Sequence, residues 1–135
     1  MHVDMLKSAC GALWNISENE DPGTANDYGE GTSVVLDVMS GHPGHAELQK
    51  NACSFLRNAV SDPTSRDILE KEEGVSIMLT VCRVFRADAD FMEIVLDVLR
   101  GLNCSNARPY VYDSILAAVL PLFKLYQAPE SNPLG

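Results

Sequence analysis

The side chains with binding chemistry recur along the chain at a spacing of 43 residues. Lys7 corresponds to Lys50, and Trp14 corresponds to Arg57 and Arg100. Arginine makes forked hydrogen bonds to carboxylates and phosphates, and tryptophan stacks on apolar groups. Four of the ten basic residues belong to these rows. The sequence therefore predicts a binding surface for an anionic ligand.

The residues that could catalyse a reaction or bind a metal lack the spacing that such sites need. His42 and His45 have no second pair of ligands at zinc spacing, so we expect ordinary loop histidines. The cysteines sit in apolar stretches without a Cys-x-x-Cys pair, which indicates reduced, buried thiols. They are Cys10, Cys53, Cys82 and Cys104. Phosphate-binding and nucleophile motifs are absent, and we expect no enzyme, no metal and no cofactor.

The composition is that of one small helical domain. Of 135 residues, 46% are apolar and 7% aromatic, and the abundance of Leu, Ala, Val, Met and Glu favours helices over strands. The formal net charge of -9 opposes binding to nucleic acid or to an anionic membrane surface. No apolar run has the length of a membrane span, and residues 1–20 do not resemble a signal peptide. We therefore expect a cytoplasmic location, with the nucleus as a second compartment.

Whole segments repeat in the register of the basic residues. Residues 33–39 align on residues 76–82 at the same shift of 43, and Leu13, Leu56 and Leu99 fall on equivalent positions. A period of this length is typical of a solenoid built from repeated helices. We expect the three leucines to occupy equivalent core sites.

Capping residues and apolar spacing place the helices. Asp62 before Pro63 is predicted to cap one helix and Asp88 another. Residues 17–32 are rich in glycine and acids and are predicted to be a loop. Pro121 is expected in a first helical turn, where proline is harmless. The predicted helices cover about residues 3–17, 33–39, 45–60, 63–72, 76–85, 89–103, 106–117 and 119–127.

The N-terminal repeat is incomplete in this scheme, because the chain begins in a third helix. An apolar stripe on that helix would lack part of its cover; its members are Met5, Ala9, Ala12, Leu13 and Ile16. We assign residues 1–127 to one repeat domain and residues 128–135 to a disordered tail. The repeat parts cover residues 1–17, 31–61, 62–104 and 105–127.

The third helices resemble those of the armadillo-repeat family. Residues 12–16, Ala-Leu-Trp-Asn-Ile, match the family signature Ala-Leu-x-Asn-(Leu/Ile), and residues 55–59 match it more loosely. Gly101 stands where the signature has asparagine. The resemblance covers residues 3–127 and implies an all-α, right-handed superhelix of three-helix repeats; a HEAT-type solenoid is the alternative.

The resemblance also implies a concave groove lined by third helices, which binds extended peptides through a ladder of asparagines. Asn15 and Asn58 are the expected rungs. A helical wheel that turns Ala9, Ala12, Leu13 and Ile16 toward the core turns Lys7, Gly11 and Trp14 outward, toward this groove. The candidate partner-binding residues, here called the strip, are Lys7, Trp14, Asn15, Lys50, Arg57, Asn58 and Arg100.

We therefore expect an interaction module or scaffold that binds a partner protein or an extended peptide, acidic or phosphorylated, in the groove. The acidic stretch from Glu18 to Glu30 would repel such a ligand at one end of the strip. The strip could also be an ordinary solvated face, in which Asp97 and Arg100 pair with each other. The alternative function is a structural fragment of a longer solenoid, which forms a homo-oligomer through its uncapped N-terminal helix.

Overall fold

The computed structural model describes residues 2–18, 28–71, 74–102 and 109–127, and for residues 109–112 it describes the backbone alone. These residues are all helical apart from short connections, and no strand occurs among them. The all-α expectation is confirmed. The helices are α1 (Val3–Glu18), α2 (Tyr28–Gly41), α3 (Ala46–Ala59), α4 (Pro63–Lys71), α5 (Gly74–Val84), α6 (Ala89–Gly101) and α7 (Pro109–Gln127).

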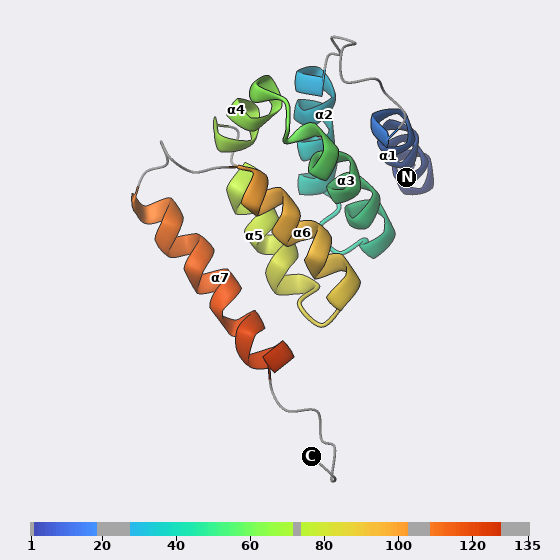
Figure 1. The fold of residues 1–135 in the computed structure, drawn as a ribbon. Helices are drawn as coiled ribbons and strands as arrows, with labels where there is room; N and C mark the ends of the chain where they lie inside the picture. The colour runs from blue at the N-terminus through green and yellow to red at the C-terminus, as the bar shows by residue number, and fades with distance from the viewer. Residues whose placement is uncertain (1, 19–27, 72–73, 103–108, 128–135) are drawn as a thin grey trace.

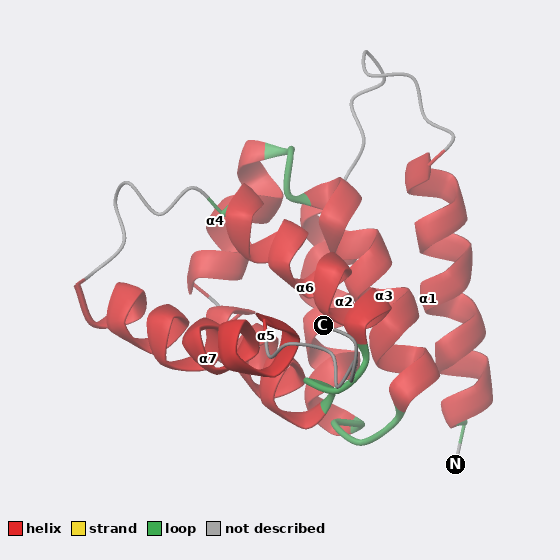
Figure 2. Ribbon diagram, turned by 60° about the horizontal axis from the view of Figure 1, so that its bottom comes forward, coloured by secondary structure: helices red, strands yellow, loops and turns green. Residues whose placement is uncertain are grey.

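Helices one period apart in the sequence pack side by side. α1 packs on α3, and α3 packs on α6 (Figure 1). Behind this row, α2 packs on α3 and α5 packs on α6, while α2, α4 and α5 also contact one another. α7 packs on α5. α1 and α7 consequently lie at opposite ends of the molecule, as both views show (Figures 1 and 2).

In the two inner helices of the row, α3 and α6, the core residues are at the positions that the 43-residue register predicts. Leu56 is 0% exposed and Leu99 is 7% exposed, so both leucines are core residues as predicted. Leu13, the third member of the set, is partly buried and packs against the same core. The shared register thus gives equivalent core positions in α3 and α6 and a less covered one in α1.

Two predicted aspartate caps are present. The Asp62 carboxylate accepts a hydrogen bond from the backbone N–H of Ser65 at 3.1 Å. The Asp88 carboxylate accepts one from the backbone N–H of Phe91, also at 3.1 Å. Each satisfies an N–H that the first helical turn leaves without a partner. These caps fix where α4 and α6 begin.

The loop predicted over residues 17–32 is wrong at both ends, because α1 continues to Glu18 and α2 begins at Tyr28. Tertiary contacts explain the early start of α2. The Tyr28 ring lies 6.0 Å from the Phe55 ring, and the Thr32 hydroxyl donates to the Ser65 hydroxyl at 2.9 Å in a buried site. These contacts outweigh the low helix propensity of the glycines. Residues 19–27 lie outside the described part.

Gly74 begins α5, two residues before the predicted start of this helix at residue 76. A Cβ atom at Gly74 would collide with the backbone oxygen of Leu69. Glycine is required here by the close approach of α5 to the end of α4. Gly74, a residue type that commonly ends helices, therefore lies where two helices are in close contact.

The two helices predicted over 106–117 and 119–127 form one helix, α7, and Pro121 lies in its interior and not in a first turn. Proline removes one hydrogen bond to the carbonyl of Ala117, but both residues are exposed, so water can replace it. On the face turned toward the core, Ala118 and Leu122 are buried, and the Cys82 thiol donates to the carbonyl of Ala118 at 3.8 Å. Packing on both sides of Pro121 holds the helix together.

The buried state of Cys104, the start of the helix predicted at residue 106 and the disordered tail at 128–135 also fall outside the described residues. Within the described residues, no helix combines the length and the apolar character that crossing a membrane requires.

We predict that Leu56→Ala lowers the free energy of unfolding by about 2–5 kcal/mol, because it leaves a cavity in a fully buried site. Urea denaturation followed by circular dichroism measures this loss. Val34→Ala, on an exposed face of α2, is the control and should change stability by less than about 0.5 kcal/mol. Equal effects of the two changes would contradict the core assignment.

Candidate functional site

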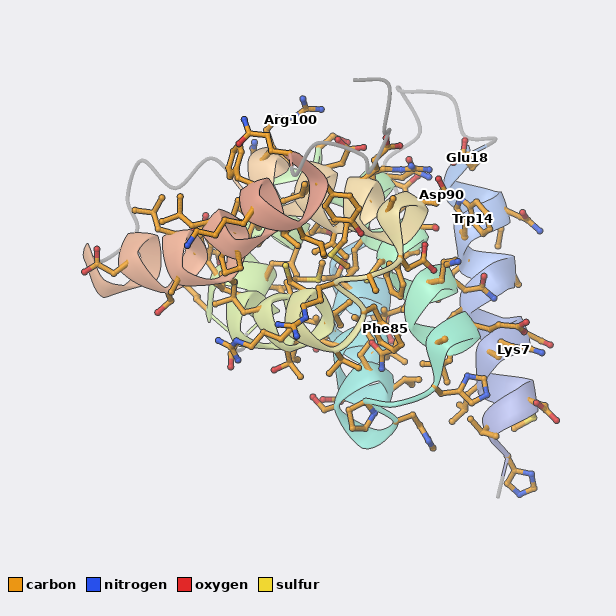
Figure 3. The ribbon with its side chains drawn as sticks, turned by 90° about the horizontal axis from the view of Figure 1, so that it is seen from below. Lys7, Trp14, Glu18, Phe85, Asp90 and Arg100 are labelled. Carbon is orange, nitrogen blue, oxygen red and sulfur yellow. The ribbon has the colours of Figure 1, made fainter. Side chains whose placement is uncertain are left out.

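The strip is spread over the row formed by α1, α3 and α6. Lys7, Trp14 and Glu18 follow one another along α1, whereas Arg100 lies far from them on α6 (Figure 3). Lys50, Arg57 and Asn58 belong to α3, between the two. Three helices therefore position the strip, and the packing of α3 against its two neighbours sets the distances within it.

The most highly connected group of the site is Glu18, at the end of α1. Its Oε1 accepts hydrogen bonds from Trp14 Nε1 at 3.0 Å and from Asn58 Nδ2 at 3.1 Å, and it lies 3.7 Å from Arg57 Nη2. Asn58 Nδ2 also donates to the Ser17 hydroxyl at 2.9 Å. We call these five residues the Glu18 cluster. Asn58 and then Trp14, together with the Arg57 charge, hold the pKa of Glu18 below its ordinary value.

The two lysines of the strip join neighbouring helices in the same way. Lys7 on α1 forms an ion pair with Glu47 on α3 at 3.2 Å. One period later, Lys50 on α3 pairs with Asp88, the cap of α6, also at 3.2 Å. The Lys50 ammonium lies 5.7 Å from the centroid of the Phe91 ring, a cation–π geometry. The backbone N–H of Phe91 and the Lys50 ammonium hold the pKa of Asp88 below its ordinary value.

Arg100 pairs with Asp97 of its own helix at 3.0 Å, the pairing that the sequence analysis offered as the alternative to ligand binding. Its side chain is 84% exposed, so this pair is weak and accessible to solvent. The neighbouring Gly101 departs from the armadillo signature for a steric reason. A Cβ atom there would lie 2.6 Å from Cγ1 of Val60, so the close approach of α6 to the end of α3 favours glycine.

The predicted orientation of α1 is wrong for three of the four residues that it turned toward the core, while Leu13 packs against the core as expected. Ala9, Ala12 and Ile16, which were assigned to the core, are exposed, and Trp14, which was assigned to the outer face, packs against the core. Cys10 is the residue that α1 buries. The wheel assumed that helices cover the alanine face, but α1 is held by its contact with α3, which lies on the other side.

Lys7 and Gly11, the other residues predicted to point outward, are half-buried on the same side of α1. Asn51 of α3 reaches this side and donates its Nδ2 to the backbone oxygen of Lys7 at 3.2 Å. Asn15 is exposed. Asn58, the second expected rung, donates to the Glu18 cluster and so fastens α1 to α3.

The carboxylates Glu18, Glu47 and Asp88 complete the site, although none of them was among the predicted partner-binding residues. Each lies 38 to 40 residues from the cation with which it pairs. This separation is slightly less than one period, which is the distance expected for residues on neighbouring third helices. A search for opposite charges at this spacing could have found all three pairs.

Gln49 was also missed. It is fully buried, and its Nε2 donates to the backbone oxygens of Met39 at 3.0 Å and His42 at 2.8 Å. His45 caps α3 by accepting the N–H of Leu48. In the described part of the chain, no three His, Cys, Asp or Glu side chains are grouped to hold a metal ion. The segment from His42 to His45 joins α2 to α3.

The three cysteines in the described part of the chain are buried as predicted. Cys10, Cys53 and Cys82 are free and inaccessible, and burial raises the pKa of each thiol. A thiol with a raised pKa is a poor nucleophile, because the thiolate is the reactive form. These residues contribute to packing.

Comparison of the chain with models of protein families, with curated proteins and with solved structures finds no match.

We predict that Asn58→Ala raises the pKa of Glu18 toward its ordinary value of 4.5, because it removes the largest cause of the lowered value. The lowered pKa stabilises the folded state above about pH 4.5, and this contribution is lost as the pH falls through the folded value. The variant should therefore lose less stability than the wild type on acidification. An NMR titration of the Glu18 carboxyl carbon measures the pKa.

Asn51→Ala is the matched control, because Asn51 also joins α3 to α1 but does not contact Glu18. It should leave the Glu18 titration unchanged. A shift of equal size in both variants would mean that loosening of α1, and not the hydrogen bond to Glu18, controls the pKa.

Proposed function

We propose that the chain is an armadillo-like solenoid of three-helix repeats that binds a partner through the row of α1, α3 and α6. Its support is the agreement between the 43-residue register and the packing. The helices that the register makes equivalent are direct neighbours, and α2 and α5, which precede α3 and α6, are neighbours too. A superhelix arises when one such unit follows another with the same contacts.

The observation that carries the function is the Glu18 cluster. It gathers an indole, a guanidinium and an amide from two helices around one accessible carboxylate. The Arg57 side chain is partly shielded but still in contact with solvent. A carboxylate of a bound peptide that replaced Glu18 would meet the same three donors in the same geometry. The cluster is therefore a preorganised receptor for an acidic side chain.

Binding at this cluster is an exchange of carboxylates. The ligand carboxylate gains the hydrogen bonds and the ion pair that Glu18 gives up. Each arginine therefore contributes less to the free energy of binding than an arginine without a carboxylate partner would. Arg100 offers the same exchange with Asp97 at the far end of the row. The ligand that fits is an extended protein segment with acidic or phosphorylated residues, spaced to reach two neighbouring helices.

The net charge of -9 restricts such binding to the row itself, because the rest of the surface repels an acidic ligand. We accordingly propose a protein interaction module or scaffold, and not an enzyme, that acts on protein partners in the cytoplasm and the nucleus. Nucleic acid, membranes and cofactors are not among its proposed ligands.

We predict that Arg57→Ala weakens the binding of an acidic extended peptide about tenfold, because the ligand carboxylate loses a charged hydrogen-bond partner. Trp14 is the single tryptophan of the chain and belongs to the cluster, so its fluorescence reports binding directly. A panel of extended peptides that differ in acidic and phosphorylated positions supplies the probes. Arg66→Ala, on α4, is the control and should have little effect.

Glu18→Gln tests the exchange itself. It removes the competing charge and should strengthen the binding of the same peptides several-fold, with the largest gain for the most acidic. Binding that is equally weakened by Arg57→Ala and Arg66→Ala, or that is weakened by Glu18→Gln, would contradict the proposed site.

A further inference from the structure

The apolar stripe of α1 is exposed in the structure. Met5 is 62% exposed and Ile16 is 54% exposed, and Ala9 and Ala12 between them are exposed as well. The same register positions in the next two helices are 2% exposed or less. In α3 they are Leu48, Ala52, Phe55 and Ala59, and in α6 and its C-cap they are Phe91, Val95, Val98 and Leu102. α1 thus has the same apolar face as α3 and α6, but this face is exposed on α1.

An apolar groove lies between α6 and α7 at the other end of the molecule. Its volume is about 470 Å³. Met92 of α6 and Leu122 of α7 are its most buried lining residues, and Leu96, Val119 and Phe123 line it as well. Phe123 is 56% exposed. The groove is therefore open along the surface that α7 presents to solvent.

The chain contains a filled counterpart of this groove. α6 packs on both α3 and α5, and it turns its apolar face toward the core there. α7 packs on α5 as α5 packs on α2. α6 and α7 are consequently arranged like α3 and α5, displaced by one repeat along the row. A helix with the apolar face of α6 is the one that this second pair can receive.

We propose that α1 of a second copy of this chain occupies the groove between α6 and α7. α1 has the required face, and the α1 of the same chain lies at the opposite end of the molecule (Figures 1 and 2). The contact is heterologous, because it joins two different surfaces. Copies associate head to tail, and the row α1, α3, α6 continues from one copy into the next. This assembly uses surfaces outside the Glu18 cluster.

Glu93 sets the strength of this contact. It occupies the register position of Lys7 and Lys50, and each of those lysines pairs with a carboxylate at the beginning of the next helix. The arriving α1 carries Asp4 in its first turn. Glu93 and Asp4 repel each other where the two inner contacts of the row have an ion pair. Association of chains with a net charge of -9 should therefore increase with salt.

Sedimentation equilibrium over a range of protein concentrations tests the assembly. The wild type should increase in mass with concentration, and more strongly at high salt. Ile16→Asp and Phe123→Asp each block one of the two surfaces at an exposed position, so each variant alone should stay monomeric and folded. Their mixture should form a one-to-one dimer and nothing larger, because each variant retains the surface that the other has lost. Val34→Asp, exposed on α2, is the control and should associate like the wild type.

Glu93→Lys should tighten association by roughly fivefold, since a repulsive pair becomes an attractive one. A wild type that is monomeric at every concentration overturns the proposal. So does loss of association in Ile16→Asp alone, without loss in Phe123→Asp, since that pattern indicates that two α1 helices pair with each other. A mixture of the two blocked variants that remains monomeric overturns it too.

Discussion

The packing of α3 between α1 and α6 is the constraint on which the rest of the structure depends. Because the three helices are one period apart, any residue type that recurs at 43 residues recurs on the same face of the row. Leu56 and Leu99 become core residues for this reason, and Lys7 and Lys50 become bridges to the next helix. The same register that builds the core therefore also places the charges between its helices. A shift of one helix along another would therefore disrupt the core contacts and the ion pairs together.

The sequence predicted the elements that depend on local signals and misplaced those that depend on contacts. Asp62 and Asp88 are capping residues whose effect is confined to one turn, and both were predicted correctly. The start of α2 depends on Tyr28 and Thr32 meeting α3 and α4, which no local pattern contains. Pro121 was treated as a boundary because proline opposes a helix, yet packing of residues on either side of it keeps α7 continuous. Helix propensity therefore determines where a helix begins or ends only if tertiary contacts do not favour a different position.

The candidate site was predicted as a set of cations, amides and one indole, and the structure adds the anions. Basic residues in one row suggested a positive groove, but Lys7, Lys50, Arg57 and Arg100 each lie within 3.7 Å of a carboxylate. A search for basic residues that recur at a spacing of 43 finds the cation of each pair. It does not find the carboxylate, because the carboxylate occupies a different position in the repeat. The physical result is a surface that is close to neutral and already organised. The selectivity of the proposed binding would therefore depend on the geometry of its donors more than on its charge.

α1 belongs to both proposed interactions, and it uses different faces for them. Trp14 and Glu18 lie against α3, where the cluster is built, and Met5 and Ile16 face solvent on the other side of the helix. A ligand at the cluster and a second copy in contact with α1 therefore do not compete for the same atoms. They are connected through the attachment of α1 to α3, because each holds the helix in place from its own side. The two interactions can nevertheless be tested separately, because a substitution at Glu18 and one at Met5 alter different faces of α1.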